Sequence, residues 1–200
     1  IGSHPMARRP DGSDVKDGRV RQSCLLISHE GKLVARYDKV HLFDVLVNDK
    51  AAVYQESRFI EPGDVSTVVY DMAGVKLGLS ICYDLRFSYL YRDLAKAGAD
   101  ILAVPAAFTV PTGKAHWQTL LRARAIETGS FVIAPGQTGE HEGGRKTWGH
   151  SVIINPWGEI LAEMDEKPGI ITADLNIDDV ARAREAIPAL THDRDYTVKS

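Results

Sequence analysis

Short apolar runs separated by glycine-containing turns recur along the chain from residue 23 onward. Runs of about four to eight apolar and β-branched residues between turn residues are typical of strands. The runs at 23–28 and 33–37 flank a short turn with Gly31, which predicts a hairpin. In all, we expect strands at 23–28, 33–37, 65–70, 75–81, 100–104, 131–134, 151–155, 159–164 and 170–175.

Three other segments have the spacing or composition of helices, and we expect helices at 87–97, 115–127 and 177–186. The second places Trp117, Leu120, Leu121 and Ala125 on one side. Gly98 stops the first helix, and Pro188 stops the third. Because strands and helices alternate through the middle of the chain, we predict a single α/β domain over residues 1–200.

Two segments lack a clear period. Residues 1–21 mix glycine, serine and proline with dense charge, and they read as a loop. Residues 38–62 have weak periodicity, which predicts a long, partly ordered loop. Loops of that length inside a compact domain are commonly functional.

Composition excludes several classes of protein. The 200 residues include 24 basic and 27 acidic side chains, a formal net charge of −3, and no basic run, so a nucleic-acid-binding surface is not expected. Apolar stretches are too short to span a bilayer, and the chain does not open with a secretory signal. With only two cysteines we expect a reduced protein of the cytoplasm.

Cys82 is the first candidate for chemistry. An apolar strand delivers it to the start of a helix, where backbone N–H groups and the helix dipole would stabilise a thiolate nucleophile. The alternative is that Cys82 is a small buried core residue. A serine-hydrolase elbow around Ser80 is excluded, because position 82 would have to be glycine.

A thiolate nucleophile needs a proton acceptor and a group that stabilises an oxyanion. His116 and His150 are candidate acceptors, although each could be a structural histidine. Lys39 follows a strand and could turn inward beside the thiolate, or it could lie on the surface. No spacing of histidine or cysteine indicates a metal site, and no glycine-rich loop indicates a phosphate site.

Several motifs together resemble the carbon–nitrogen hydrolase (nitrilase) superfamily, and in particular its Nit branch, which contains ω-amidases and the amidase acting on deaminated glutathione. The motifs follow the family's order along nearly the whole chain. They are YDKVHLFD (37–44), GLSICYDLRF (78–87), GKAHW (113–117), LRARAIET (121–128), GHS (149–151) and NPWGE (155–159).

The resemblance implies an αββα four-layer sandwich that usually dimerises and that carries a Cys–Glu–Lys triad. Cys82 then matches the nucleophile and Lys39 the lysine that stabilises the oxyanion. The backbone N–H of Tyr83 matches the second oxyanion donor, and Glu56 matches a glutamate that helps to orient the site.

The resemblance also implies an acyl pocket lined by Arg86, Phe108 and Thr112. Arg86 lies about one helical turn beyond the cysteine and could hold a substrate carboxylate through two hydrogen bonds. It could equally pair with Asp84, and Phe108 could also serve in core packing.

One feature of the family is missing. Its general-base glutamate stands in a Leu-Pro-Glu-like motif, and the early glutamates here, Glu30, Glu56 and Glu61, lie in other contexts. We therefore expect the sequence to lack the N-terminal segment of the family's domain.

These observations predict a thiol-dependent amidase that releases ammonia from a small carboxylate-bearing amide, with water as the second substrate and without a metal or organic cofactor. The alternatives are a nitrilase or N-carbamoyl hydrolase with the same residues, an inactive scaffold, and a hydrolase pairing Cys82 with His116 or His150. We expect a homodimer or higher homo-oligomer, with contacts from the helix carrying Trp117, Arg122 and Arg124 and from the tail that starts at Pro188.

Overall fold

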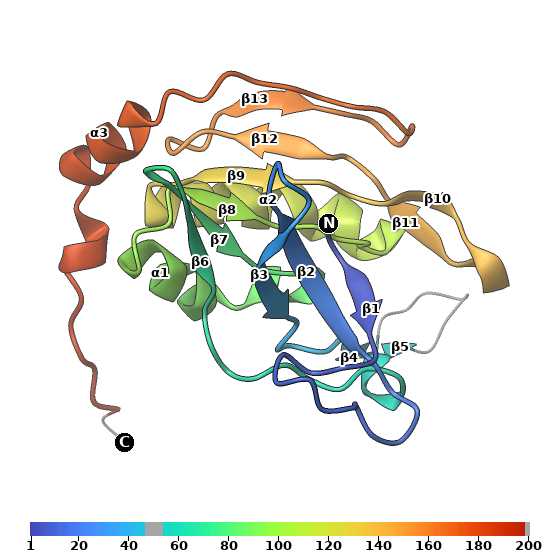
Figure 1. The fold of residues 1–200 in the computed structure, drawn as a ribbon. Helices are drawn as coiled ribbons and strands as arrows, with labels where there is room; N and C mark the ends of the chain where they lie inside the picture. The colour runs from blue at the N-terminus through green and yellow to red at the C-terminus, as the bar shows by residue number, and fades with distance from the viewer. Residues whose placement is uncertain (47–53, 199–200) are drawn as a thin grey trace.

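A six-stranded sheet forms the centre of the computed structural model, which describes residues 1–46 and 54–198 (Figure 1). The strand order is β13–β12–β9–β8–β7–β6, and β7, β8 and β9 run parallel to one another. The strands are β6 (Val69–Met72), β7 (Val75–Leu79), β8 (Ile101–Ala103), β9 (Phe131–Ala134), β12 (Val152–Ile154) and β13 (Ile160–Glu163).

Two helices connect the parallel strands, since such strands cannot be joined by a tight turn. α1 (Ser88–Lys96) links β7 to β8, and α2 (Val110–Thr128) links β8 to β9. Both helices pack on the same face of the sheet, where Leu94 and Leu121 join Leu102 and Val132 in the main core. Burial of this apolar face is the principal stabilisation of both helices.

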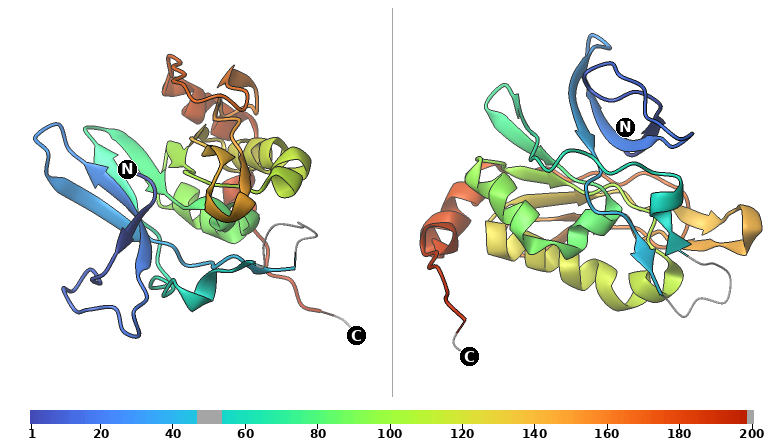
Figure 2. Two further views of the ribbon diagram at one scale, coloured as in Figure 1. Left: turned by 90° about the vertical axis from the view of Figure 1, so that its right-hand side faces the viewer. Right: turned by 90° about the horizontal axis from the view of Figure 1, so that it is seen from below.

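A second sheet covers part of the opposite face, so that helices, large sheet and small sheet form successive layers (Figure 2). It consists of β1 (His4–Met6), β2 (Arg21–Ile27) and β3 (Leu33–Asp38), all antiparallel. Cys24 and Tyr37 of this sheet pack against Leu79 and Ile81.

The remaining elements lie around this framework. α3 (Asp178–Ala186) buries Val180 against Ile101 and Phe131. Two small hairpins pair β4 (Asp44–Val45) with β5 (Tyr54–Gln55), and β10 (Thr138–Glu140) with β11 (Lys146–Trp148). The 3-10 turns among the described residues are η1 (Glu56–Arg58), η2 (Cys82–Arg86), η3 (Glu142–Gly144) and η4 (Ala189–Thr191).

The predicted α/β class is confirmed, and three segments differ from expectation. Residues 1–21 are not only loop, because β1 pairs with β2. Residues 170–175 form no strand, and Ile170 is 91% exposed. Part of the loop expected at 38–62 is ordered as β4, β5 and η1, while its residues 47–53 lie outside the described residues.

Two predicted elements begin four or more residues away from their predicted starts. The strand expected at 65–70 begins at Val69. α2 begins five residues before the predicted start, because the side chain of Thr109 accepts a hydrogen bond from the N–H of Thr112 and caps the helix. Pro111 is compatible with this first turn, where its missing N–H has no helical partner to lose.

Candidate active site

Cys82 stands at a sharp turn just after β7. Its φ is +51°, a left-handed backbone conformation that is unfavourable for a residue with a side chain. Its N–H donates to the carbonyl of Pro105 at 2.9 Å, which ties the turn to the segment that follows β8. The fold therefore holds the half-buried thiol at the end of the parallel strands in a conformation that local preference alone would not select.

A buried carboxylate joins this turn to the segment around Lys39. Asp84 is 0% exposed, and one of its oxygens accepts from the N–H of Ile81 at 2.9 Å and from the Tyr37 hydroxyl at 2.8 Å. The other accepts from the N–H of His41 at 3.2 Å. Asp84 thus binds the residue before the cysteine and residues on both sides of the lysine.

Lys39 and Glu56 form an ion pair beside the thiol. The ammonium nitrogen of Lys39 lies 2.7 and 2.5 Å from the two carboxylate oxygens of Glu56, and the Lys39 residue is 3% exposed. Glu56 also accepts from the N–H of Phe43 at 2.5 Å. An ammonium paired and hydrogen-bonded in this way can remain charged in a buried position, and its orientation is set by the carboxylate.

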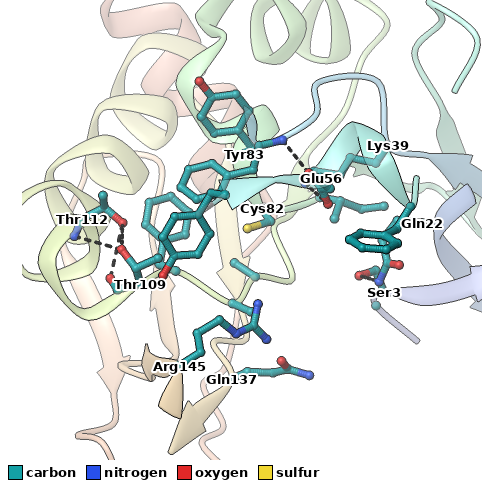
Figure 3. A pocket seen from close by; sticks show the side chains of 18 of the residues that line it. Ser3, Gln22, Lys39, Glu56, Cys82, Tyr83, Thr109, Thr112, Gln137 and Arg145 are labelled. Carbon is teal, nitrogen blue, oxygen red and sulfur yellow. Dashed lines mark hydrogen bonds and ion pairs between the residues drawn. The ribbon is translucent and has the colours of Figure 1, made fainter. Parts of the chain in front are cut away.

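Cys82, Lys39 and Glu56 line one cavity of about 450 Å³ (Figure 3). A cavity of this size suits a small molecule. The other lining residues are Gly2, Ser3, Gln22, Phe43, Tyr54, Gln55, Phe59, Ile81, Tyr83, Ala106, Ala107, Phe108, Thr109, Thr112, Gln137 and Arg145.

The pKa of the Cys82 thiol differs from what its predicted position at the start of a helix implies. Burial raises the pKa of Cys82, and the nearby charge of Lys39 and a hydrogen bond with the backbone of Ala107 oppose that rise only in part. The expected stabilisation of a resting thiolate is therefore wrong, because desolvation disfavours the anion more than its surroundings favour it.

The structure brings Tyr83, Phe108 and Thr112 to the same cavity as the cysteine. Phe108 is also buried against Trp117, with ring centroids 4.9 Å apart, so its packing role and its place in the cavity wall coexist. The side chain of Thr112 is held by the hydroxyl of Thr109 at 2.8 Å.

Arg86 lies beside the cavity wall and is not among the lining residues. Its guanidinium carbon is 5.8 Å from the ring centroid of Tyr83 and 5.6 Å from that of Phe108, and Nη2 lies 3.2 Å from Nδ1 of His116. The carboxylate of Asp84 is engaged by other donors. That Arg86 binds a substrate carboxylate stays a prediction.

Neither candidate histidine lines the cavity. His116 contacts Arg86, while the ring of His150 stacks on Trp148 at 3.9 Å and its Nδ1 lies 2.7 Å from the carbonyl of Trp148. The geometry therefore favours the cysteine–lysine–glutamate arrangement over a cysteine–histidine pair.

Arg145 and Gln137, which line the cavity, were not predicted as site residues. Arg145 belongs to the β10–β11 hairpin, whose three-residue strands were too short for the periodicity analysis to detect. Its proximity to Cys82 depends on how that hairpin folds back.

Over residues 1–46 and 54–198, the side chains of histidine, cysteine, aspartate and glutamate form no group of three that could hold a metal ion. In the same residues, none of the helices combines the length and apolar character needed to cross a membrane.

Comparisons with known proteins agree with this geometry. The family model for carbon-nitrogen hydrolases matches residues 4–185. A deaminated glutathione amidase from Synechocystis sp. is 52% identical over 177 residues, covering 88% of this chain and 64% of the relative. Omega-amidase NIT2 from Homo sapiens is 36% identical over 177 residues, covering 88% and 63%. The chain thus spans slightly less than two thirds of these relatives.

Solved structures show the same fold. Nit3 from Saccharomyces cerevisiae, described as a member of branch 10 of the nitrilase superfamily, aligns with a TM-score of 0.80 at 29% identity, covering 96% of this chain and 64% of that one. A variant amidase from Nesterenkonia sp. AN1, with the acetamide moiety of fluoroacetamide added covalently at its active-site cysteine, aligns with a TM-score of 0.73 at 29% identity, covering 92% and 63%. This chain belongs to the carbon–nitrogen hydrolase family.

Proposed function

We propose that the protein is an amidase that hydrolyses a small carboxylate-bearing amide through a thioester on Cys82. The observation that carries the proposal is the meeting of Cys82 with the Lys39–Glu56 ion pair in one cavity. A nucleophile beside a fixed ammonium is what acyl transfer requires, since negative charge develops on the carbonyl oxygen during attack.

The first step forms the thioester. The Cys82 sulfur attacks the amide carbon and forms the carbon–sulfur bond, the carbonyl oxygen becomes an oxyanion, and the thiol proton passes to the amide nitrogen. Lys39 stabilises that oxyanion, and we assign the backbone N–H of Tyr83 as a second donor. The oxyanion then re-forms the carbonyl, the carbon–nitrogen bond breaks, and the nitrogen leaves as ammonia with the proton it took from the thiol.

Water completes the reaction. Its oxygen attacks the thioester carbon, the carbon–sulfur bond breaks, and the carboxylic acid product leaves as the thiol is restored. Glu56 is the only carboxylate among the described residues that line the cavity, and it is bound to Lys39 and to the N–H of Phe43. We therefore assign Glu56 to positioning Lys39.

An amide is favoured over the alternative substrates because the relatives quoted above are amidases of deaminated glutathione and of omega-amides. A nitrile or an N-carbamoyl compound would use the same three residues. Ammonia release from a matched panel of amides, nitriles and carbamoyl compounds separates these reactions. A preference for nitriles or carbamoyl compounds would overturn the amidase assignment.

Cys82→Ala tests the nucleophile in the intact protein. We expect the wild type to release ammonia and to show the mass of an acylated enzyme when an amide is mixed with it, and we expect the variant to show neither. Circular dichroism provides the control for folding. Undiminished turnover by Cys82→Ala would contradict the proposal, as would the absence of amide hydrolysis by the wild type.

We also propose a cytoplasmic homodimer. Within the expected contact helix α2, Trp117 and Arg124 are buried within the chain, where they donate to the carbonyls of His150 and Leu85, so other side chains of this helix would have to make the contacts. The exposed side chains of Ile126 and Trp157 are better candidates for contacts. Light scattering on the purified protein measures the oligomeric state, and a monomer at all concentrations would contradict this part of the proposal.

A further inference from the structure

Arg145 is the second cation in the wall of the cavity. It stands between η3 and β11, is half-buried, and lines the same space as Cys82. Figure 3 shows its side chain extending toward the interior of the cavity, which Gln137 also lines. Unlike Lys39, it reaches the cavity from the β10–β11 hairpin.

The guanidinium of Arg145 has no hydrogen bond or ion pair with any other described residue. Every other buried or half-buried arginine in residues 1–46 and 54–198 has a polar partner. Arg9 binds Glu61, Arg36 binds Asp38, and Arg184 donates to the carbonyl of Ala99. An arginine withdrawn from water is disfavoured unless an anion or hydrogen-bond acceptor meets it.

The charges around the cavity do not balance without a ligand. Glu56 neutralises Lys39, so the permanently charged guanidinium of Arg145 leaves one positive charge without a counter-charge among the described lining residues. A carboxylate would neutralise that charge and could accept two parallel hydrogen bonds from the guanidinium.

We propose that Arg145 binds the carboxylate of the substrate, at the end remote from the amide that Cys82 attacks. This inference rests on the proposed function and specifies its substrate: an amide of a dicarboxylic acid, whose free carboxylate lies toward the β10–β11 hairpin. It assigns to Arg145 the specificity for anionic amides that the sequence predicts for Arg86.

Two amides of the same length test the assignment. Glutaramate carries a terminal carboxylate, and pentanamide replaces it with a methyl group. We expect Arg145→Gln to lower kcat/KM for glutaramate about 10- to 100-fold, since a hydrogen bond to a charged group is lost, and to change kcat/KM for pentanamide less than about threefold. Arg145→Lys should retain part of the preference. Arg182→Gln, on the exposed surface of α3, is the matched control.

The outcomes separate this inference from the proposed function. An equal loss of kcat/KM for both amides in Arg145→Gln, or no loss for glutaramate, would overturn the role of Arg145. Either result would leave the proposed amidase activity unaffected. A loss confined to Arg86→Gln would assign the carboxylate to Arg86 instead. If the wild type hydrolyses neither amide, the anion site can still be tested by calorimetry, which measures the binding of glutarate to Cys82→Ala. Weaker binding in Cys82→Ala/Arg145→Gln supports the anion site, and unchanged or undetectable binding in both overturns it.

Discussion

Asp84 makes two contacts with His41. Its carboxylate accepts a hydrogen bond from the backbone N–H of His41 at 3.2 Å and lies 2.7 Å from Nδ1 of the His41 ring. The ring of His41 also stacks on Phe87, with centroids 3.6 Å apart. Since His41 follows Lys39 by two residues and Asp84 follows Cys82 by two, this contact sets the lysine segment against the nucleophile turn. A single buried carboxylate therefore connects the two halves of the active site.

Asp84→Asn should weaken both stability and activity. The amide retains one acceptor oxygen but turns an NH₂ group toward neighbouring donors, so at least one buried hydrogen bond is lost. We expect the free energy of unfolding to fall by about 1–3 kcal/mol, and kcat to fall in the fraction that remains folded. Urea unfolding and ammonia release measure the two effects.

Asp174→Asn is the control for that substitution, because Asp174 is exposed and no hydrogen bond of its carboxylate is found among the described residues. It should leave both quantities unchanged. Wild-type stability in Asp84→Asn would show that the carboxylate does not connect the two segments.

Lys39→Gln should shift the reaction of Cys82 with iodoacetamide to higher pH. Burial already raises the thiol pKa, and Lys39 lowers it. Removing the ammonium deletes the opposing effect and leaves the charge of Glu56, which raises the pKa further, so the thiolate forms only at higher pH. The rate of alkylation as a function of pH measures the shift in the thiol pKa. The rate of Cys82→Ala, which reports the reaction of Cys24 alone, is subtracted.

The double variant Lys39→Gln/Glu56→Gln removes both charges. Its alkylation rate should therefore rise at a lower pH than that of Lys39→Gln. Lys16→Gln, on the exposed N-terminal loop, should match the wild type. A profile for Lys39→Gln that moves to lower pH would refute the role of Lys39 as the cation facing the sulfur.

Glu56→Gln should lower kcat more than it changes KM. The neutral amide cannot compensate the buried ammonium of Lys39, whose position then depends on weaker contacts, and stabilisation of the oxyanion is lost mainly in the transition state. We expect kcat to fall about 10- to 1,000-fold, at most as much as the loss of one oxyanion donor costs. Steady-state kinetics test this, with the exposed Glu185→Gln as control. An effect on KM alone would point to substrate binding.

Glu61 should make stability depend on pH in the acid range. Hydrogen bonds from Arg9 and Arg21, against some opposing desolvation, lower the pKa of Glu61 from 4.5 to about 2. A carboxyl group with a lower pKa in the folded state stabilises fully above its unfolded pKa, and this contribution is lost as pH falls through the folded pKa. Glu61→Gln should therefore be less stable than wild type at pH 7, and the difference should shrink between about pH 4.5 and 2.

Urea unfolding of both proteins at several pH values gives that difference. Glu185→Gln should show no such dependence, because this exposed carboxylate makes no ion pair with any described residue. A constant difference between wild type and Glu61→Gln down to pH 2 would show that the ion pairs of Glu61 do not contribute.

The sequence by itself determined the elements that depend on local periodicity and turn chemistry. The apolar run before Cys82 predicted β7, and the spacing of Trp117, Leu121 and Ala125 predicted the buried side of α2. α2 ends at Thr128, and the next residue is Gly129, whose φ of 58° is accessible to glycine without steric cost. Motif resemblance indicated Cys82, Lys39 and Glu56, which the fold indeed brings to one cavity.

Tertiary structure alone decided the chemistry of these groups. Three contacts join segments that are separated in the chain: the ion pair of Lys39 with Glu56, the contacts of Asp84 with His41, and the approach of Arg145 to the cavity. No local sequence pattern specifies which of these segments meet. The raised pKa of Cys82 likewise arises from burial by several elements at once. Hydrophobic spacing specifies which face of each element turns inward, whereas charge pairing and desolvation are set only when those faces pack together.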